Sequence, residues 1–126
     1  MNYEAMSDFE INKSVLKAHT GGLVCNIRQH RLKKLRAFKG RVLFDLTDED
    51  DDVFGEVDYC NIPADMWPII IQNNIELSPL YRGEWCASVV NNYTYNEDPI
   101  YDLQHAHANP LRAAAIVFLM MKEAEK

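Results

Sequence analysis

The stretch that decides the fold is Asn109-Pro110-Leu111-Arg112-Ala113-Ala114-Ala115-Ile116-Val117-Phe118-Leu119-Met120-Met121. Asparagine is a strong N-cap, and proline suits the first helical position because an N–H there would have no intrahelical acceptor. From Leu111 to Met121 the chain is apolar on every side of a helix except at Arg112. A helix that is apolar all round has to be covered on all sides, so the sequence predicts a buried C-terminal helix.

Arg112 is the one charged residue in this apolar run. A cation in the first turn opposes the helix dipole, and a buried charge normally has a partner of opposite sign. We expect a structural carboxylate partner, and Asp65 is the candidate. An arginine that binds a ligand is the alternative.

Two further helices are predicted from the residues that start them. Ser7 and Glu10 have the spacing of a capping box, and they precede the helical apolar pattern of residues 8–18. Pro63 suits the first position of a helix over residues 63–73. The N-termini of both helices depend on local backbone hydrogen bonding, so they can be predicted without knowledge of the tertiary structure.

Strand character appears in five segments, which are residues 23–27, 41–44, 53–59, 75–77 and 84–90. Residues 29–39 fit either a basic amphipathic helix or an exposed hairpin, and residues 91–109 look polar, aromatic and irregular. We therefore predict one α+β domain over residues 1–126, with a small antiparallel sheet of about four to five strands packed against about three helices.

The composition is that of an ordinary globular protein, with 48% hydrophobic and 25% charged residues. The N-terminus lacks the basic and apolar regions of a secretory signal, and the longest apolar run is about half of the roughly 18 residues that span a bilayer. Cys25, Cys60 and Cys86 have no paired spacing, which argues against a disulfide framework or a zinc ribbon. We expect a cytoplasmic protein with no membrane span.

The net charge of −6 hides two adjacent blocks of opposite sign. Residues 28–41 contain seven basic residues and no acidic one, whereas residues 45–58 contain eight acidic residues and no basic one. The basic block could contact phosphates, although the neighbouring carboxylates would repel a polyanion unless the fold separates the blocks. The candidate binding residues in this block are Arg28, Arg31, Lys33, Lys34 and Arg36.

Two segments could bind metal, and each has a simpler interpretation. The acidic run 48–52 lacks the glycine and the terminal glutamate of a calcium loop, so a solvated loop is expected. His105 and His107 would share one face if extended, and could form a zinc site with a cysteine, but no spacing fixes that geometry. We predict no metal and no cofactor, and no catalytic constellation stands out.

Tyrosines set among asparagines form a second candidate binding surface, which contains Tyr93, Tyr95 and Tyr101. Tyrosine supplies contact area at low entropic cost, although these residues could equally cover the edge of the core. Trp67 and Trp85 are interpreted as core residues, and we expect at least one of them to be largely buried.

Three stretches carry a resemblance to a known family. They are residues 7–13 (Ser-Asp-Phe-Glu-Ile-Asn-Lys), residues 59–70 (Tyr-Cys-Asn-Ile-Pro-Ala-Asp-Met-Trp-Pro-Ile-Ile) and residues 109–121. Together they resemble the NinX-like family of small tailed-phage and prophage proteins. The middle stretch departs from the family pattern at Ile62 and Met66, so Asn61 could cap the helix from one residue earlier. The resemblance implies a phage or prophage setting and an accessory role, and it names no activity.

The leading hypothesis is a non-enzymatic phage accessory protein that binds a host or phage protein in the bacterial cytoplasm. It is motivated by the resemblance, the segregated charge and the tyrosine-rich segment. The alternative is a nucleic-acid-binding accessory factor that uses residues 28–41. A small metal-dependent enzyme is the third hypothesis.

Overall fold

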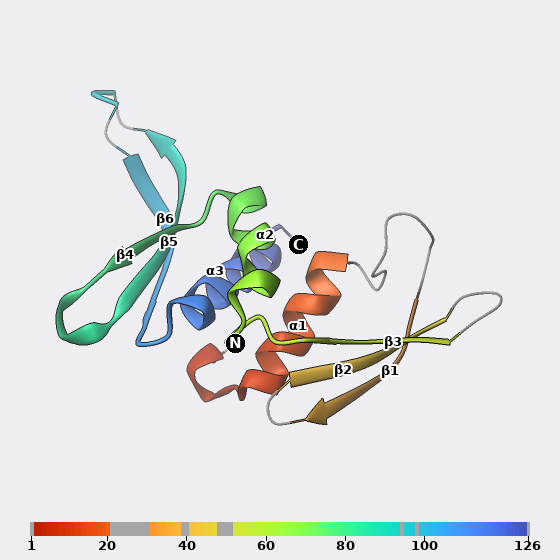
Figure 1. The fold of residues 1–126 in the computed structure, drawn as a ribbon. Helices are drawn as coiled ribbons and strands as arrows, with labels where there is room; N and C mark the ends of the chain where they lie inside the picture. Colours follow the sequence, from red (N-terminus) through yellow and green to blue (C-terminus); the bar gives the residue numbers. More distant parts are fainter. Residues whose placement is uncertain are drawn as a thin grey trace. The chain divides into compact units, whose positions relative to one another are not determined.

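The computed structural model divides the chain into two compact units, Met1–Asp58 and Tyr59–Lys126, each with its own three-stranded antiparallel sheet (Figure 1). The residues that it describes are 2–20, 31–38, 41–47, 52–93, 95–97 and 99–125. The α+β class is as predicted. The prediction of a single sheet with about four to five strands was wrong, because the strands of the described residues form two separate sheets of three.

The first unit begins with a short 3-10 turn, η1 (Tyr3–Ala5), and helix α1 (Asp8–Thr20). The predicted N-terminal helix is thereby confirmed. Its start uses the capping serine, since the backbone N–H of Glu10 donates to Ser7 Oγ at 3.1 Å. The helix buries three apolar side chains one turn apart or adjacent, Ile11, Val15 and Leu16.

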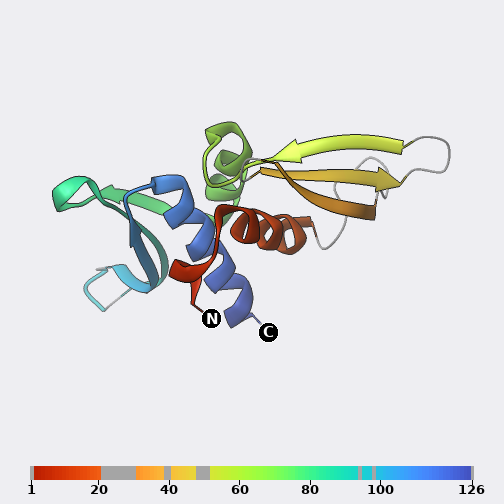
Figure 2. The same ribbon diagram turned by 90° about the horizontal axis from the view of Figure 1, so that it is seen from below.

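The sheet of the first unit consists of strands β1 (Arg31–Phe38), β2 (Arg41–Thr47) and β3 (Asp52–Val57), in that spatial order. Helix α1 lies against the sheet at β2 (Figure 2). The alternative left open for residues 29–39 is decided for the described part, because β1 is a strand that pairs with β2. The strand predicted over residues 23–27 lies outside the described residues.

Strand β1 contains one extra residue, Lys33, at a β-bulge. Leu32 pairs with Leu46, and the next pair is Lys34 with Asp45, so the pairing register shifts by one residue. Leu32 and Leu35 are three residues apart, so regular alternation would place them on opposite faces of the sheet, and the bulge brings them onto the same face. The register gives one face only apolar positions or glycine, namely 32, 35 and 37 of β1, 42, 44 and 46 of β2, and 53, 55 and 57 of β3.

The second unit contains, in chain order, α2 (Pro63–Asn73), β4 (Glu76–Pro79), η2 (Tyr81–Gly83), β5 (Trp85–Tyr93), β6 (Pro99–His107) and α3 (Pro110–Ala124). Its strands are ordered β4-β5-β6, and α3 packs against β5, β6 and α2. The predicted helix over residues 63–73 and the predicted C-terminal helix are both confirmed.

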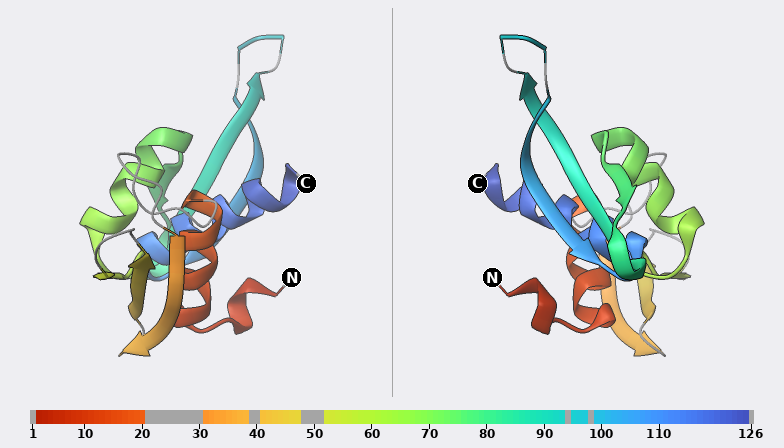
Figure 3. Two further views of the ribbon diagram at one scale, coloured as in Figure 1. Left: turned by 90° about the vertical axis from the view of Figure 1, so that its right-hand side faces the viewer. Right: turned by 90° about the vertical axis from the view of Figure 1, so that its left-hand side faces the viewer.

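Strand β6 contradicts the prediction that residues 91–109 are irregular. It pairs along its length with β5, from Tyr93 opposite Pro99 to Trp85 opposite His107. The two strands form a ribbon that extends beyond helix α3 (Figure 3). Polar and aromatic residues became a strand because a neighbouring strand was available for backbone pairing, which is a property of the fold and not of the local sequence.

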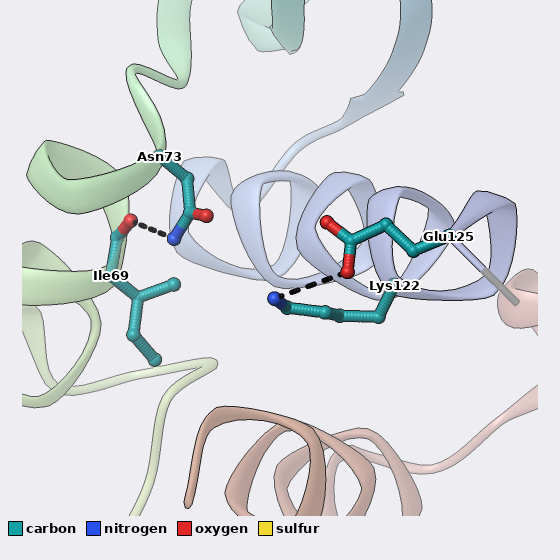
Figure 4. Close-up of polar contacts among 4 residues, drawn as sticks. All are labelled: Ile69, Asn73, Lys122 and Glu125. Carbon is teal, nitrogen blue, oxygen red and sulfur yellow. Dashed lines mark hydrogen bonds and ion pairs between the residues drawn. The ribbon is translucent and has the colours of Figure 1, made fainter.

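Helix α3 is the centre of the second unit. Every residue from Arg112 to Leu119 is buried, which confirms the predicted buried helix. The last turns of α2 and α3 are each stabilised by a contact within the helix (Figure 4). In α2, Asn73 Nδ2 donates to the carbonyl oxygen of Ile69 at 2.8 Å, and in α3, Lys122 pairs with Glu125 at 3.5 Å. Three side chains of α2 complete this core, Met66, Ile69 and Ile70.

Candidate functional site

The start of α3 is organised by the side chain of Asn109. Its Oδ1 accepts hydrogen bonds from the backbone N–H of Leu111 at 3.0 Å and of Arg112 at 3.3 Å. The backbone N–H of Asn109 donates to Nδ1 of His107 at 2.9 Å, so the last residue of β6 is tied to the first turn of the helix. Asn109 thus confirms its predicted role as the N-cap.

The same side chain also reaches the segment that precedes α2. Asn109 Nδ2 donates to the carbonyl oxygen of Cys60 at 2.6 Å and to Oδ1 of Asn61 at 3.3 Å. The N-cap of α2 is Ile62, which has no side-chain capping bond. Asn61 therefore contacts the α3 cap, and the starts of the two helices form one polar cluster joined by the hydrogen bonds of Asn109.

Tyr59 is buried beside this cluster, and the pKa of its hydroxyl is raised to about 12. Burial is the larger cause, because it disfavours the charged phenolate, and the negative charge of Asp65 raises the pKa further. Asp65 therefore lies close enough to Tyr59 to act on it electrostatically. Tyr59 is the buried polar residue of this region that sequence reasoning did not single out.

Arg112 is buried, with 7% of its surface exposed, and it lies in the first turn of α3 as predicted. Asp65, its predicted partner, is partly buried and lies in the first turn of α2, in the same unit. The pairing of these two side chains stays a prediction.

The exposed face of α2 carries two large apolar side chains. Trp67 and Ile71 lie one turn apart, and 55% and 56% of their surfaces are exposed. Residues at this spacing share a helix face. Trp67 was interpreted as a core residue, and that interpretation is wrong because α2 buries the face that carries Met66, Ile69 and Ile70.

The turn between β4 and β5 also presents large side chains to solvent. Leu80 is exposed and Tyr81 is almost fully exposed. The turn is closed by a 2.7 Å hydrogen bond from the N–H of Leu80 to the carbonyl oxygen of Glu84. Arg82 adopts a positive φ of 65° there, which is unfavourable for a residue with a side chain.

The three tyrosines predicted as a binding surface are placed separately along the β5–β6 ribbon. Tyr95 lies between the two strands and is fully exposed. Tyr93 pairs with Pro99 and Tyr101 pairs with Val90 in the strand register. The structure thus brings all three onto one ribbon, with a described side chain only at Tyr95.

The predicted basic residues lie on β1, except that Arg28 is outside the described residues. Arg31, Lys34 and Arg36 share one sheet face by register, and Lys33 is the bulged residue. Lys34 is directly opposite Asp45. The fold therefore places part of the acidic block next to the basic block within one sheet.

The residues weighed as metal ligands do not assemble in the described part of the chain, where no group of three or more histidine, cysteine or acidic residues could hold a metal ion. His105 and His107 share one face of β6, opposite Ala87 and Trp85, whereas Cys86 occupies the other face of β5. The acidic run 48–52 is described only at its last residue, where β3 begins.

Among the described residues, no helix is both long enough and apolar enough to cross a membrane. Comparison with curated proteins returned no match to this chain. A family model described as Bacteriophage P22, NinX matches residues 2–122, which include nearly the whole chain and span both units. The chain therefore belongs to the bacteriophage P22 NinX family, as its three resembling stretches predicted.

Proposed function

We propose that this protein is a phage accessory protein that acts without catalysis, by binding a host or phage protein in the bacterial cytoplasm. The observation that carries the proposal is the apolar face of α2, where Trp67 and Ile71 are each more than half exposed. Tryptophan is among the residues that dominate binding energy at protein interfaces. Covering the exposed half of a tryptophan removes about 100 Å² from water, which contributes roughly 2.5 kcal/mol.

The test is affinity capture of tagged full-length protein from phage-infected and uninfected host cells. Wild type is compared with the Trp67→Ala/Ile71→Ala variant, and with Tyr81→Ala as an exposed aromatic control in the turn between β4 and β5. We expect a specific partner whose recovery falls at least tenfold for the α2 variant and is unchanged for the control. A partner retained equally by both variants would contradict this surface assignment, and the absence of any specific partner would contradict the function.

A second candidate is nucleic-acid binding through β1, which is favoured by four basic residues on one edge strand. Asp45 lies directly opposite Lys34, and Asp52 and Glu56 lie on the same sheet face. These carboxylates repel phosphates, which makes this candidate weaker than protein binding. Binding of a labelled oligonucleotide at 25 mM salt that weakens steeply with added salt would favour it.

We also propose that residues 1–126 form one domain and that Arg112 pairs with Asp65. Support for one domain comes from the family match, which runs through the boundary between the units. A single calorimetric unfolding transition is expected, and two separate transitions would contradict the proposal of one domain.

Support for the pair of Arg112 with Asp65 is that a buried arginine and a carboxylate lie in the first turns of two helices that touch. A double-mutant cycle with Asp65→Asn and Arg112→Met should give a coupling of at least 1 kcal/mol, and additive effects would exclude the pair.

A further inference from the structure

The sheet of the second unit has β5 in the middle, with β4 and β6 as its two edge strands. The hydrogen bond from the N–H of Leu80 to the carbonyl oxygen of Glu84 shows which backbone groups of β4 point toward β5. Hydrogen-bonded and non-hydrogen-bonded residue pairs alternate along an antiparallel pair of strands. Because the β4–β5 register is regular, every second residue counted back from Leu80 bonds to β5, and the backbone groups of Leu77 and Pro79 point away from it.

The same alternation identifies the outward groups of β6. The residues of β5 that do not bond to β4 bond to β6, and the β5–β6 register is regular from His107 back to Leu103. His107, His105 and Leu103 therefore bond to β5, whereas the N–H and C=O groups of Gln104 and Ala106 point outward. Gln104 and Ala106 are exposed, and no other described strand pairs with β6 on this side.

The two edges of this sheet differ in how they resist further pairing. β4 has four residues, begins with a charged one, Glu76, and has Pro79, which lacks an N–H, at one of its outward positions. Short length, charge and proline are the features that protect an edge strand from pairing with another chain. β6 has nine residues, and its segment 103–107 contains no proline and no acidic residue, lysine or arginine. Edge strands are normally protected, so the unprotected edge of β6 indicates a surface that pairs with a further strand.

The β6 edge is complementary to a second copy of itself. When two copies pair antiparallel about His105, Gln104 lies opposite Ala106 of the other copy and Ala106 lies opposite its Gln104. Both pairs use the outward backbone groups, which gives four backbone hydrogen bonds. A two-fold register centred on Gln104 or on Ala106 would use only one of these two residues within 103–107. The absence of acidic residues, lysine and arginine in this segment means that none of these charges faces its own kind across the contact.

We propose that the protein forms a two-fold symmetric dimer in which β6 pairs antiparallel with β6 of a second copy about His105. The contact joins the two three-stranded sheets into one continuous sheet. It uses the same patch on both copies, so it is closed, and the strands left at the outer ends are the β4 strands with Pro79. Association should therefore stop at the dimer. The β6 edge is a different element from the exposed face of α2, so this proposal and the proposed function fail independently.

The first measurement is backbone amide hydrogen exchange of the unaltered full-length chain, followed by NMR. Sedimentation velocity first identifies dilute conditions in which the protein is a monomer and concentrated conditions in which it is a dimer. Exchange at Gln104 and Ala106 should be fast in the monomer and slow by about tenfold or more in the dimer, because pairing protects these amides. The amide of His105, which bonds to β5, should be protected in both solutions.

Three outcomes of this measurement would overturn the proposal. A monomer at every concentration would show that the edge does not pair. Slow exchange of Gln104 and Ala106 in the monomer would show that another part of the same chain covers the edge. A dimer in which these two amides still exchange fast would use another surface. Protection that appears only when a captured partner protein is present would replace the second copy with a strand of that partner.

The second measurement places charges across the proposed contact. One variant carries Gln104→Lys and Ala106→Lys, and the other carries Gln104→Glu and Ala106→Glu. Within one chain these positions lie opposite Ser88 and Cys86, so no like-charge pair is created inside the sheet. Each variant alone sets like charges opposite one another in the dimer and should stay monomeric. An equal mixture sets opposite charges together and should dimerise, whereas a mixture that stays monomeric would contradict this register.

The third measurement tests the backbone directly at one position. Ala106→Pro removes an outward N–H that β5 does not use, and Ala106→Thr is the matched control because it keeps that N–H. We expect the dissociation constant of the dimer to rise about tenfold or more for the proline variant and to stay near the wild-type value for the control. Equal dimerisation of the two variants, or equal loss, would exclude pairing through the backbone of Ala106.

A final comparison separates this contact from the proposed partner-binding face. The Trp67→Ala/Ile71→Ala variant should dimerise like wild type, and Ala106→Pro should still recover the partner in affinity capture. Loss of the dimer in the α2 variant would move the contact between copies to α2. Failure to capture any partner would leave the dimer unaffected, because dimerisation is measured on the purified protein alone.

Discussion

The substitution Asn12→Asp tests the buried polar contact of the first unit. Asn12 and Asp58 are both buried, and Asn12 Nδ2 donates to Oδ1 of Asp58 at 2.9 Å. Aspartate has the same shape as asparagine, so the substitution leaves no cavity. It replaces a donor with a second carboxylate at the same distance.

Two limits set the size of the effect. If both carboxylates stayed charged, their repulsion at 2.9 Å would be about 6 kcal/mol at an effective dielectric constant of roughly 20. Keeping one carboxyl protonated at pH 7 costs only about 4 kcal/mol, because model aspartate titrates near 3.9. The smaller cost prevails, and the bound proton can bridge the two groups. The variant should therefore lose about 4 kcal/mol of unfolding free energy at pH 7.

The loss has a defined pH dependence. The shared proton is held in the folded state and released in the unfolded state, so the difference between wild type and variant shrinks by about 1.4 kcal/mol per pH unit as pH falls from 7 to 4. Urea unfolding followed by circular dichroism at four pH values in this range measures it. The exposed substitution Asn2→Asp makes the same charge change and should stay within about 0.5 kcal/mol of wild type.

The exchanged variant Asn12→Asp/Asp58→Asn restores one carboxylate and one amide. It should recover more than half of the lost stability. A loss that does not change with pH, or an exchanged variant as unstable as the single one, would refute the assignment of a direct contact between these two side chains.

Three further predictions concern the second unit. Asn109→Ala should lower the free energy of unfolding by about 2 kcal/mol, roughly 1 for the lost N-cap and roughly 1 for the lost donor to Cys60, as measured by urea unfolding; a loss under about 0.5 would contradict the shared role. The hydroxyl of Tyr59 has a pKa raised from 10.0 to about 12, so its contribution to the free energy of unfolding is complete below pH 10 and is lost between pH 10 and 12. The free energy of unfolding of wild type should therefore fall by up to about 2.7 kcal/mol more than that of Tyr59→Phe across this interval. Parallel pH profiles of the two unfolding free energies would argue against a buried hydroxyl. Gly83→Ala should cost about 1 kcal/mol through its positive φ of 75° alone, since an added Cβ meets nothing within 4 Å, and an unchanged melting temperature would show that the turn relaxes.

The helices could be predicted from the sequence because their signals are local. The capping serine of α1, the proline that opens α2 and the Asn109-Pro110 pair of α3 all act within one turn. The burial of α3 followed from its composition, since no face of it could meet water favourably.

The sheets could not be predicted in the same way. Whether the strands join one sheet or two depends on pairing between distant segments, and β6 has the polar and aromatic composition of a loop. The hydrogen bond from Asn109 to Cys60 could not be predicted either, because Cys60 lies far away in the sequence. The sequence feature that points to this region is an asparagine that closely precedes a proline, which occurs at both Asn61 and Asn109. The exposure of Trp67 was not predictable, since only the packing of α2 decides which face is outside.

The extra residue in β1 has a consequence for how this family can vary. Removing Lys33 would make the strand regular and would leave Arg31, Leu32, Lys34 and Leu35 opposite their present partners. Removing Arg36 from the regular part of the strand would instead place Leu35 and Ala37 on opposite faces of the sheet. The bulge should therefore accept both substitution and deletion of its extra residue, while a deletion of one residue in the regular part of the strand should be as damaging as a charged substitution in the core. Sequences of the family should accordingly vary at the bulge in composition and in length, and agree in length along the rest of the strand.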